Sequence, residues 1–178
     1  MPRPAATVRV DRASDVLRPR VLAALALAAL ASCGHGGPPP PSGDVAAELT
    51  LGTLDGTGSF DPATLKGKAA LVVFWRPGCP YCATELPDAL KVARAAGAEP
   101  IAVMIRPQVE GARDRGAKEM ARLQWDGTAL ADTADLLGTW KIDGVPWTLV
   151  IKPDGTAERL FVGLASADDL ARALAAAK

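Results

Sequence analysis

The stretch that decides the fold is VVFWRPGCPYCATELP, residues 72–87. It begins with β-branched and aromatic side chains typical of a buried strand, and Pro77-Gly78 ends that run. Pro80 then suits the first position of a helix, where its missing N–H costs no hydrogen bond. The stretch therefore predicts a strand, a short turn, and a helix that begins beside Cys79 and Cys82.

Cys79 and Cys82 form a C-x-x-C pair at the start of this predicted helix. If Cys79 is the N-cap, backbone amides and the positive end of the helix dipole face its sulfur and favour the thiolate. Arg76 is a further cation that could favour it. A thiolate at Cys79 can attack a disulfide, and Cys82 can then resolve the mixed disulfide. The pattern predicts a redox-active pair that needs no metal and no bound cofactor.

Other interpretations of the pair stay open at this point. A zinc site needs further ligands, and the remaining candidates, Cys33 and His35, lie outside the predicted domain. A purely structural disulfide would close a very small loop and constrain little chain. A thiol peroxidase of the peroxiredoxin type would want Thr or Ser three residues before its reactive cysteine, where Cys79 has Arg76. A non-catalytic binding module on the same fold is a further alternative.

The rest of the chain extends this unit into an α/β domain. The expected elements are a β-hairpin through Glu48–Leu54 and Gly58–Phe60, strands at Ala69–Trp75, Pro100–Arg106, Trp147–Lys152 and Thr156–Val162, and helices at Pro80–Ala96, Val109–Gln124, Asp132–Trp140 and Ser166–Ala177. Asp132 or Thr133 is the expected N-cap of the third helix. A βαβ unit followed by a β-hairpin and a helix predicts a mixed sheet with helices on both faces.

Several motifs together resemble the TlpA/ResA-like family, the membrane-tethered thioredoxin-fold thiol–disulfide oxidoreductases of bacteria. They are Leu65–Lys68, Phe74-Trp75, the continuation Cys79–Pro87 with Glu85 in it, and Gly144-Val145-Pro146. The resemblance covers Ala47–Lys178. It implies a thioredoxin fold, with a central mixed β-sheet flanked by helices and an added N-terminal β-hairpin.

The resemblance also implies roles for single residues. Cys79 would be the attacking cysteine and Cys82 the resolving one. Glu85 would lie under the pair and could shuttle the proton of Cys82, with a solvated helix carboxylate as the alternative. Val145 and Pro146 would be joined by a cis peptide bond, and the Val145 backbone would pair with an extended substrate segment.

Two tryptophans are further candidates for the substrate surface. Trp147 follows the proline and could form a hydrophobic wall of a substrate groove, with core packing at the strand start as the alternative. Trp75, at the end of the strand before the cysteines, is assigned to the same surface. Gly78 replaces the tryptophan that usually precedes the first cysteine in this fold, which would open the approach to Cys79.

Residues 1–32 have the features of a signal peptide. Val21–Ala31 is an apolar run too short to span a membrane, which takes about 20 residues, but suited to the core of a secretory signal. Leu30–Cys33 resembles a bacterial lipobox, so Cys33 is predicted to be acylated; a plain secretory leader is the alternative. Residues 33–46 then form a Gly/Pro-rich linker, and residues 47–178 the thioredoxin-like domain.

Charge and export signals narrow the function further. The chain has 20 basic and 20 acidic side chains and no basic block, so nothing indicates nucleic-acid binding. We expect a monomer facing the periplasm and anchored through Cys33, with the outer membrane favoured because Gly34, not aspartate, follows it. The expected activity is to reduce or exchange disulfides in exported proteins, with electrons from a thiol carrier in the membrane or periplasm.

Overall fold

The computed structural model of the chain describes residues 39–178. The predicted signal peptide and the first part of the predicted linker, residues 33–38 with Cys33, lie outside the described residues. Within residues 39–178, no helix combines the length and the apolar character that crossing a bilayer requires.

A six-stranded mixed sheet forms the centre of the domain, with the strand order β1-β4-β3-β2-β5-β6. Its strands are β1 Gly52–Thr53, β2 Ala70–Trp75, β3 Glu99–Met104, β4 Thr128–Ala131, β5 Trp147–Ile151 and β6 Ala157–Val162. The pairs β2–β3 and β3–β4 are parallel, whereas β1–β4, β2–β5 and β5–β6 are antiparallel. This confirms the predicted βαβ unit followed by a β-hairpin.

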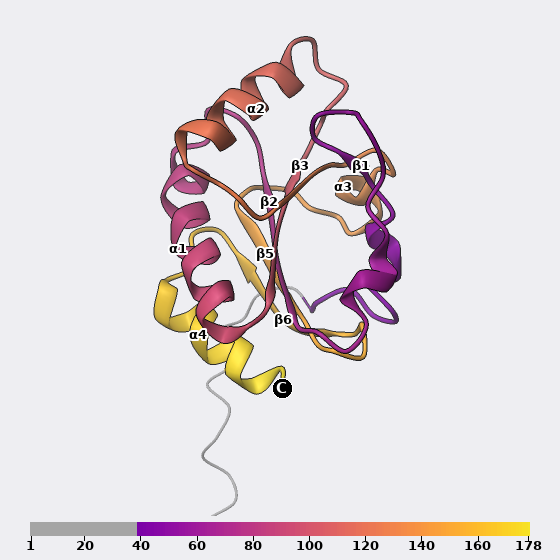
Figure 1. Cartoon of the computed structure of the whole chain (residues 1–178), viewed down its shortest axis with the longest axis vertical. Helices are drawn as coiled ribbons and strands as arrows, with labels where there is room; N and C mark the ends of the chain where they lie inside the picture. Colours follow the sequence, from indigo (N-terminus) through magenta and orange to yellow (C-terminus); the bar gives the residue numbers. More distant parts are fainter. Residues whose placement is uncertain (1–38) are drawn as a thin grey trace, which may run out of the picture. The chain divides into compact units, whose positions relative to one another are not determined.

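Helices cover the two faces of this sheet unequally (Figure 1). The helical elements are η1 Ala47–Leu49, η2 Pro62–Leu65, α1 Pro80–Ala96, α2 Ala112–Arg122, α3 Leu136–Thr139 and α4 Ala167–Ala176, where η denotes a 3₁₀ helix. The helices α1, α2 and α4 pack on one face, and η1, η2 and α3 on the other. Alternation along β2 sends Trp75 to the first face and Phe74 to the second, since successive side chains of a strand point to opposite sides.

The prediction of an N-terminal strand at Glu48–Leu54 is wrong for most of that segment. Its first residues form η1, and only Gly52–Thr53 pair with the sheet. The apolar–polar alternation that suggested a strand reflects buried Leu49 and Leu51 separated by exposed Thr50. The expected hairpin is present but short: Gly52 bridges to Ser59, and the Phe60 amide donates a hydrogen bond to the Leu51 carbonyl at 2.8 Å.

Strand β4 has no counterpart among the expected elements. Its sequence, TALA, is too short and too poor in β-branched residues to signal a strand, and it forms because β3 and β1 pair with it on both sides. The helix expected at Asp132–Trp140 is shorter and begins at Leu136. The predicted N-cap, Asp132 or Thr133, is wrong: Asp135 is the N-cap, and its side chain accepts a hydrogen bond from the Gly138 amide at 3.3 Å. Asp132 lies further upstream and accepts hydrogen bonds from the amides of Leu136 at 2.8 Å and Leu137 at 2.9 Å.

Candidate active site

The cysteine pair lies at the N-terminal end of α1, after the turn that follows β2. Cys79 is the N-cap of α1: its backbone is extended, and its Sγ accepts a hydrogen bond from the Cys82 amide at 3.1 Å. Pro80 occupies the first helical position, and the helix ends at Gly97, which has a left-handed φ of 71°. Both helix boundaries match the sequence prediction because both depend on local signals.

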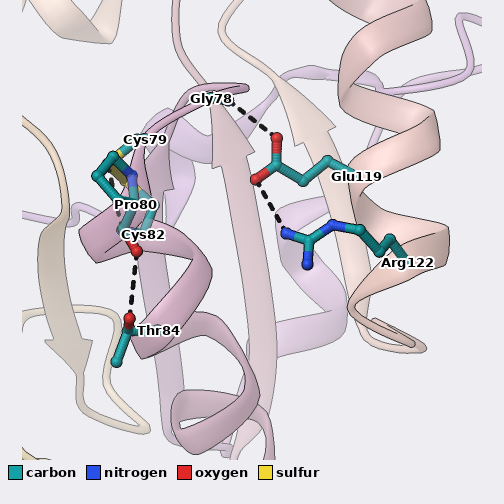
Figure 2. A network of polar contacts seen from close by, with 7 residues as sticks. All are labelled: Gly78, Cys79, Pro80, Cys82, Thr84, Glu119 and Arg122. Atoms are coloured by element: carbon teal, nitrogen blue, oxygen red, sulfur yellow. Dashed lines mark hydrogen bonds and ion pairs between the residues drawn. A yellow bond between two sulfur atoms is a disulfide. The ribbon is translucent and has the colours of Figure 1, made fainter.

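Cys79 and Cys82 are joined by a disulfide, with their Cα atoms 5.3 Å apart (Figure 2). Cys82 is fully buried, and the small exposed fraction that the pair retains, 4%, belongs to Cys79. Around it, Pro80 and Tyr81 are exposed, with Tyr81 at 63%. Cys79 is thus the more exposed of the two cysteines, as the predicted attacking and resolving roles require.

A loop with a cis peptide bond lies against the disulfide. The bond joins Val145 to Pro146, as expected. The carbonyl oxygen of Val145 lies 3.7 Å from the Cys79 Sγ. The Pro146 carbonyl accepts a hydrogen bond from the Gly163 amide at 2.9 Å, which ties this loop to the segment between β6 and α4.

Glu85 is buried one helical turn after Cys82, with no exposed surface. Its carboxylate accepts hydrogen bonds from the Thr148 hydroxyl and, at 2.7 Å, from the Ala165 amide. Burial raises the pKa of Glu85, the two hydrogen bonds oppose that rise, and the nearby charge of Asp88 adds to it. The alternative of a solvated carboxylate is therefore wrong, and this group can hold a proton inside the site.

Both candidate tryptophans lie in the core. Trp147 is 2% exposed and packs edge-on against Phe74, with ring centroids 5.4 Å apart, and next to Trp140 at 5.9 Å. Trp75 is fully buried on the other face, and its Nε1 is a buried donor without a hydrogen-bond partner. The structure thus supports the core-packing alternative for Trp147, and neither indole offers a free face to a substrate.

Two features of the site have no local sequence signal. Glu119 of α2 accepts a hydrogen bond from the Gly78 amide at 2.9 Å, although 41 positions separate the two residues. The exposed apolar side chains Val162 and Leu164 flank Gly163, which is bound to the cis-proline loop. The register of β6 against β5, which pairs Val162 with Trp147, is what places Val162 and Leu164 near this loop.

The described residues offer little to a metal ion. Among residues 39–178 there is no group of three or more His, Cys, Asp or Glu side chains placed to bind one. The geometry instead assembles a disulfide, a facing backbone carbonyl and a buried carboxylic group, which together suit thiol–disulfide exchange.

Comparisons with known proteins agree with this geometry. The family model described as a thioredoxin-like domain matches residues 59–178. The soluble secreted antigen MPT53 of Mycobacterium tuberculosis is 30% identical over 115 residues. That alignment spans 62% of this chain and 62% of the relative.

Solved structures extend the similarity over most of the described domain. A secreted disulfide oxidoreductase of M. tuberculosis, described as homologous to E. coli DsbE, is 27% identical with a TM-score of 0.63, covering 75% of this chain and 99% of that one. A thiol:disulfide interchange protein of the thioredoxin family from Chlorobium tepidum is 25% identical with a TM-score of 0.60, covering 81% and 99%.

Proposed function

We propose that this chain, which belongs to the family of thioredoxin-like domains, is an extracytoplasmic thiol–disulfide oxidoreductase that reduces or exchanges disulfides in exported proteins. The observation that carries the proposal is the Cys79–Cys82 disulfide at the N-terminus of α1, facing the Val145 carbonyl. Such a pair can exchange two electrons with a substrate while the rest of the fold stays in place.

The catalytic cycle follows from the unequal burial of the two cysteines. In the reduced protein, the Cys79 thiolate attacks one sulfur of a substrate disulfide, forming a mixed disulfide and releasing the other sulfur as a thiolate. The Cys82 thiol then loses its proton and attacks the Cys79 sulfur. The substrate leaves as a dithiol with two electrons gained, and the protein keeps the Cys79–Cys82 disulfide. A dithiol donor in the membrane or periplasm would reduce the protein again.

Glu85 would serve the second step as the proton acceptor for Cys82. It lies three residues after Cys82 on the same helix, a spacing that places both side chains on one face. Burial raises the pKa of this carboxyl group, which favours its taking up a proton inside the site. The Thr148 hydroxyl and the Ala165 amide hold its two oxygens in fixed directions.

The substrate surface would combine backbone pairing with apolar contact. An extended segment could pair with the backbone of Val145 at the cis-proline loop, as an added strand does. Val162 and Leu164, which are 47% and 51% exposed, flank Gly163, whose amide binds the Pro146 carbonyl of this loop. Tyr81, which is 63% exposed, lies between the two cysteines in the sequence.

The export signals suggest where this reaction takes place. A signal peptide over residues 1–32 and a lipobox ending at Cys33 would anchor the domain at a membrane, facing the periplasm, with the outer membrane favoured by Gly34. The description of MPT53 as secreted supports an extracytoplasmic site. Labelling with an acyl-chain analogue should mark the wild-type chain and not Cys33→Ala; label that persists in the variant would contradict the anchor.

A trapping experiment tests the function directly. The pre-reduced full-length chain should reduce a peptide that carries one disulfide in an extended segment. Cys79→Ser should abolish the reaction, and Cys82→Ser should accumulate the peptide as a mixed disulfide on Cys79. No reduction by the wild-type chain and no trapped species would refute the proposal, and rapid consumption of peroxide by the reduced chain would favour a thiol peroxidase.

A further inference from the structure

The residue before the attacking cysteine is held by a distant side chain. Gly78 has a φ of 74°, the left-handed region that favours glycine, and its amide points away from the disulfide turn toward α2. There it donates a hydrogen bond of 2.9 Å to Oε2 of Glu119 (Figure 2). Because one partner is a carboxylate, this bond is of the stronger, charge-assisted kind.

Glu119 reaches this amide from a well-seated helix. The backbone of α2 comes so close to the sheet at Gly116 that an added Cβ would lie 2.6 Å from the Met104 Sδ. Met120, next to Glu119, is buried in the same core. Because α2 packs closely on the sheet, the position of the Glu119 carboxylate is well defined, and its hydrogen bond holds the Gly78 amide.

The other oxygen of the same carboxylate faces a weaker partner. Arg122 approaches Oε1 of Glu119 at 3.6 Å, and its side chain is 63% exposed, whereas that of Glu119 is 14% exposed. Solvent weakens an ion pair in such a position. The bond to Gly78 is thus the principal fixed contact that the structure gives this carboxylate.

We propose that Glu119 is a positioning residue that holds the turn before Cys79 and makes the Cys79–Cys82 pair more reducing. This inference rests on the proposed function and deepens it, because it concerns the direction of electron flow. The hydrogen bond is present with the disulfide closed, and the proposal is that opening the disulfide weakens it, so that it favours the oxidised protein. A carboxylate beside this turn also opposes the negative charge of a thiolate at Cys79, which destabilises the reduced protein.

Both effects act in the same direction. Each favours the disulfide over the dithiol, so the reduced protein gives up its two electrons more readily. Removal of Glu119 should therefore make the pair more oxidising. A side chain whose only role was to hold α2 in place would change the stability of the fold and leave the redox equilibrium unchanged.

The test is to equilibrate the full-length chain with reduced and oxidised glutathione at pH 7 and to measure the fraction of disulfide. Glu119→Ala should shift the equilibrium constant about 10-fold toward the dithiol, which for a two-electron couple corresponds to about 30 mV. Glu119→Gln should shift it about threefold, because its amide oxygen can still accept from Gly78 but carries no charge. Asp114→Asn, which removes an exposed charge from the same helix, is the control and should leave the constant unchanged.

The outcomes separate this inference from the function on which it rests. Equal constants for the wild type and both Glu119 variants would overturn the inference alone, and so would a shift toward the disulfide. An equal shift in Asp114→Asn would also overturn it, because a general charge effect would then suffice. A wild-type chain that never exchanges with glutathione would overturn the proposed function and this inference together. Since Glu119→Gln keeps the size of the side chain, it provides a result even if Glu119→Ala folds poorly.

Discussion

Two carboxylates lie close to the cysteine pair in sequence or through the neighbouring Gly78, and their surroundings are opposite. Glu85 lies in the interior behind Cys82, where burial raises its pKa and two donors hold it. Glu119 lies at the edge of the site, where it binds the Gly78 amide and faces the exposed Arg122. The difference indicates that an interior acid suits proton transfer, whereas an acid at the edge suits holding backbone and setting the local charge.

The largest expected effect tests the role of the interior carboxylate, Glu85. Glu85→Gln should slow the release of substrate from the mixed disulfide by about 100-fold at pH 7, within the range typical for loss of a general acid or base. Rapid-mixing measurements with the disulfide peptide would follow this step. Glu110→Gln, an exposed acid outside the site, is the matched control. A rate within twofold of the wild type would remove Glu85 from the mechanism.

A change at Thr148 tests the environment of Glu85 further, because the Thr148 hydroxyl is one of the two hydrogen-bond donors to Glu85. Thr148→Val keeps the shape and removes the donor, which should cost about 1–3 kcal/mol of unfolding free energy. Because the lost bond favours the charged form, the pKa of Glu85 should rise further and the pH profile of exchange should move to higher pH. An unchanged profile would show that Thr148 does not act on Glu85.

The raised pKa of Glu85 also predicts how stability depends on pH. Above the usual carboxyl value of 4.5, the folded chain holds this proton more tightly than the unfolded chain does. Stability from this group is therefore complete below that pH and is lost as pH rises through the folded pKa, with a limiting slope of about 1.4 kcal/mol per pH unit. Urea unfolding of the wild type and Glu85→Gln between pH 4 and 8 would measure the difference.

The difference in unfolding free energy between the wild type and Glu85→Gln isolates the contribution of Glu85. Asp55 and Asp154 have pKa values lowered mainly by hydrogen bonds from Thr53 and Thr156, so their stabilisation is lost as pH falls through their folded values. That effect has the opposite sign and is the same in both proteins, so it cancels. A difference between the two proteins that did not change with pH would contradict the raised pKa of Glu85.

The smallest expected effect tests the edge of the site. Arg122→Ala removes the exposed partner of Glu119 and leaves the bond to Gly78 in place. The glutathione equilibrium constant should change by less than twofold, and unfolding free energy by less than about 1 kcal/mol, because solvent-exposed ion pairs contribute little. A shift as large as that of Glu119→Ala would mean that the ion pair, and not the amide bond, positions the turn.

The parts of this protein that were predictable from sequence depend on neighbouring residues. Pro80 and Gly97 mark both ends of α1, and the apolar run before Cys79 marks β2. The cysteine spacing and the Val145-Pro146 motif locate the reactive centre, and the structure places Cys79 and Val145 against each other as expected. Local backbone chemistry is sufficient for each of these features.

Other features required the folded chain because contacts distant in sequence create them. The four residues of β4 become a strand only between β1 and β3, and the segment Glu48–Leu54 begins in a 3₁₀ helix and pairs with the sheet only at Gly52–Thr53. The choice between a solvated and a buried Glu85 depended on Thr148 and Ala165, which lie 63 and 80 positions away. Trp147 could equally have lined a groove until its packing against Phe74 was seen.

The sequence by itself determined that a strand delivers two cysteines to the first turn of a helix, because capping, proline placement and hydrophobic periodicity act within a few residues. Only the tertiary structure decided which carboxylates surround those cysteines and in what environment. It buries Glu85 and brings Glu119 to Gly78 across 41 positions. Burial and distance set the strength of an electrostatic effect, and both are properties of the packed chain.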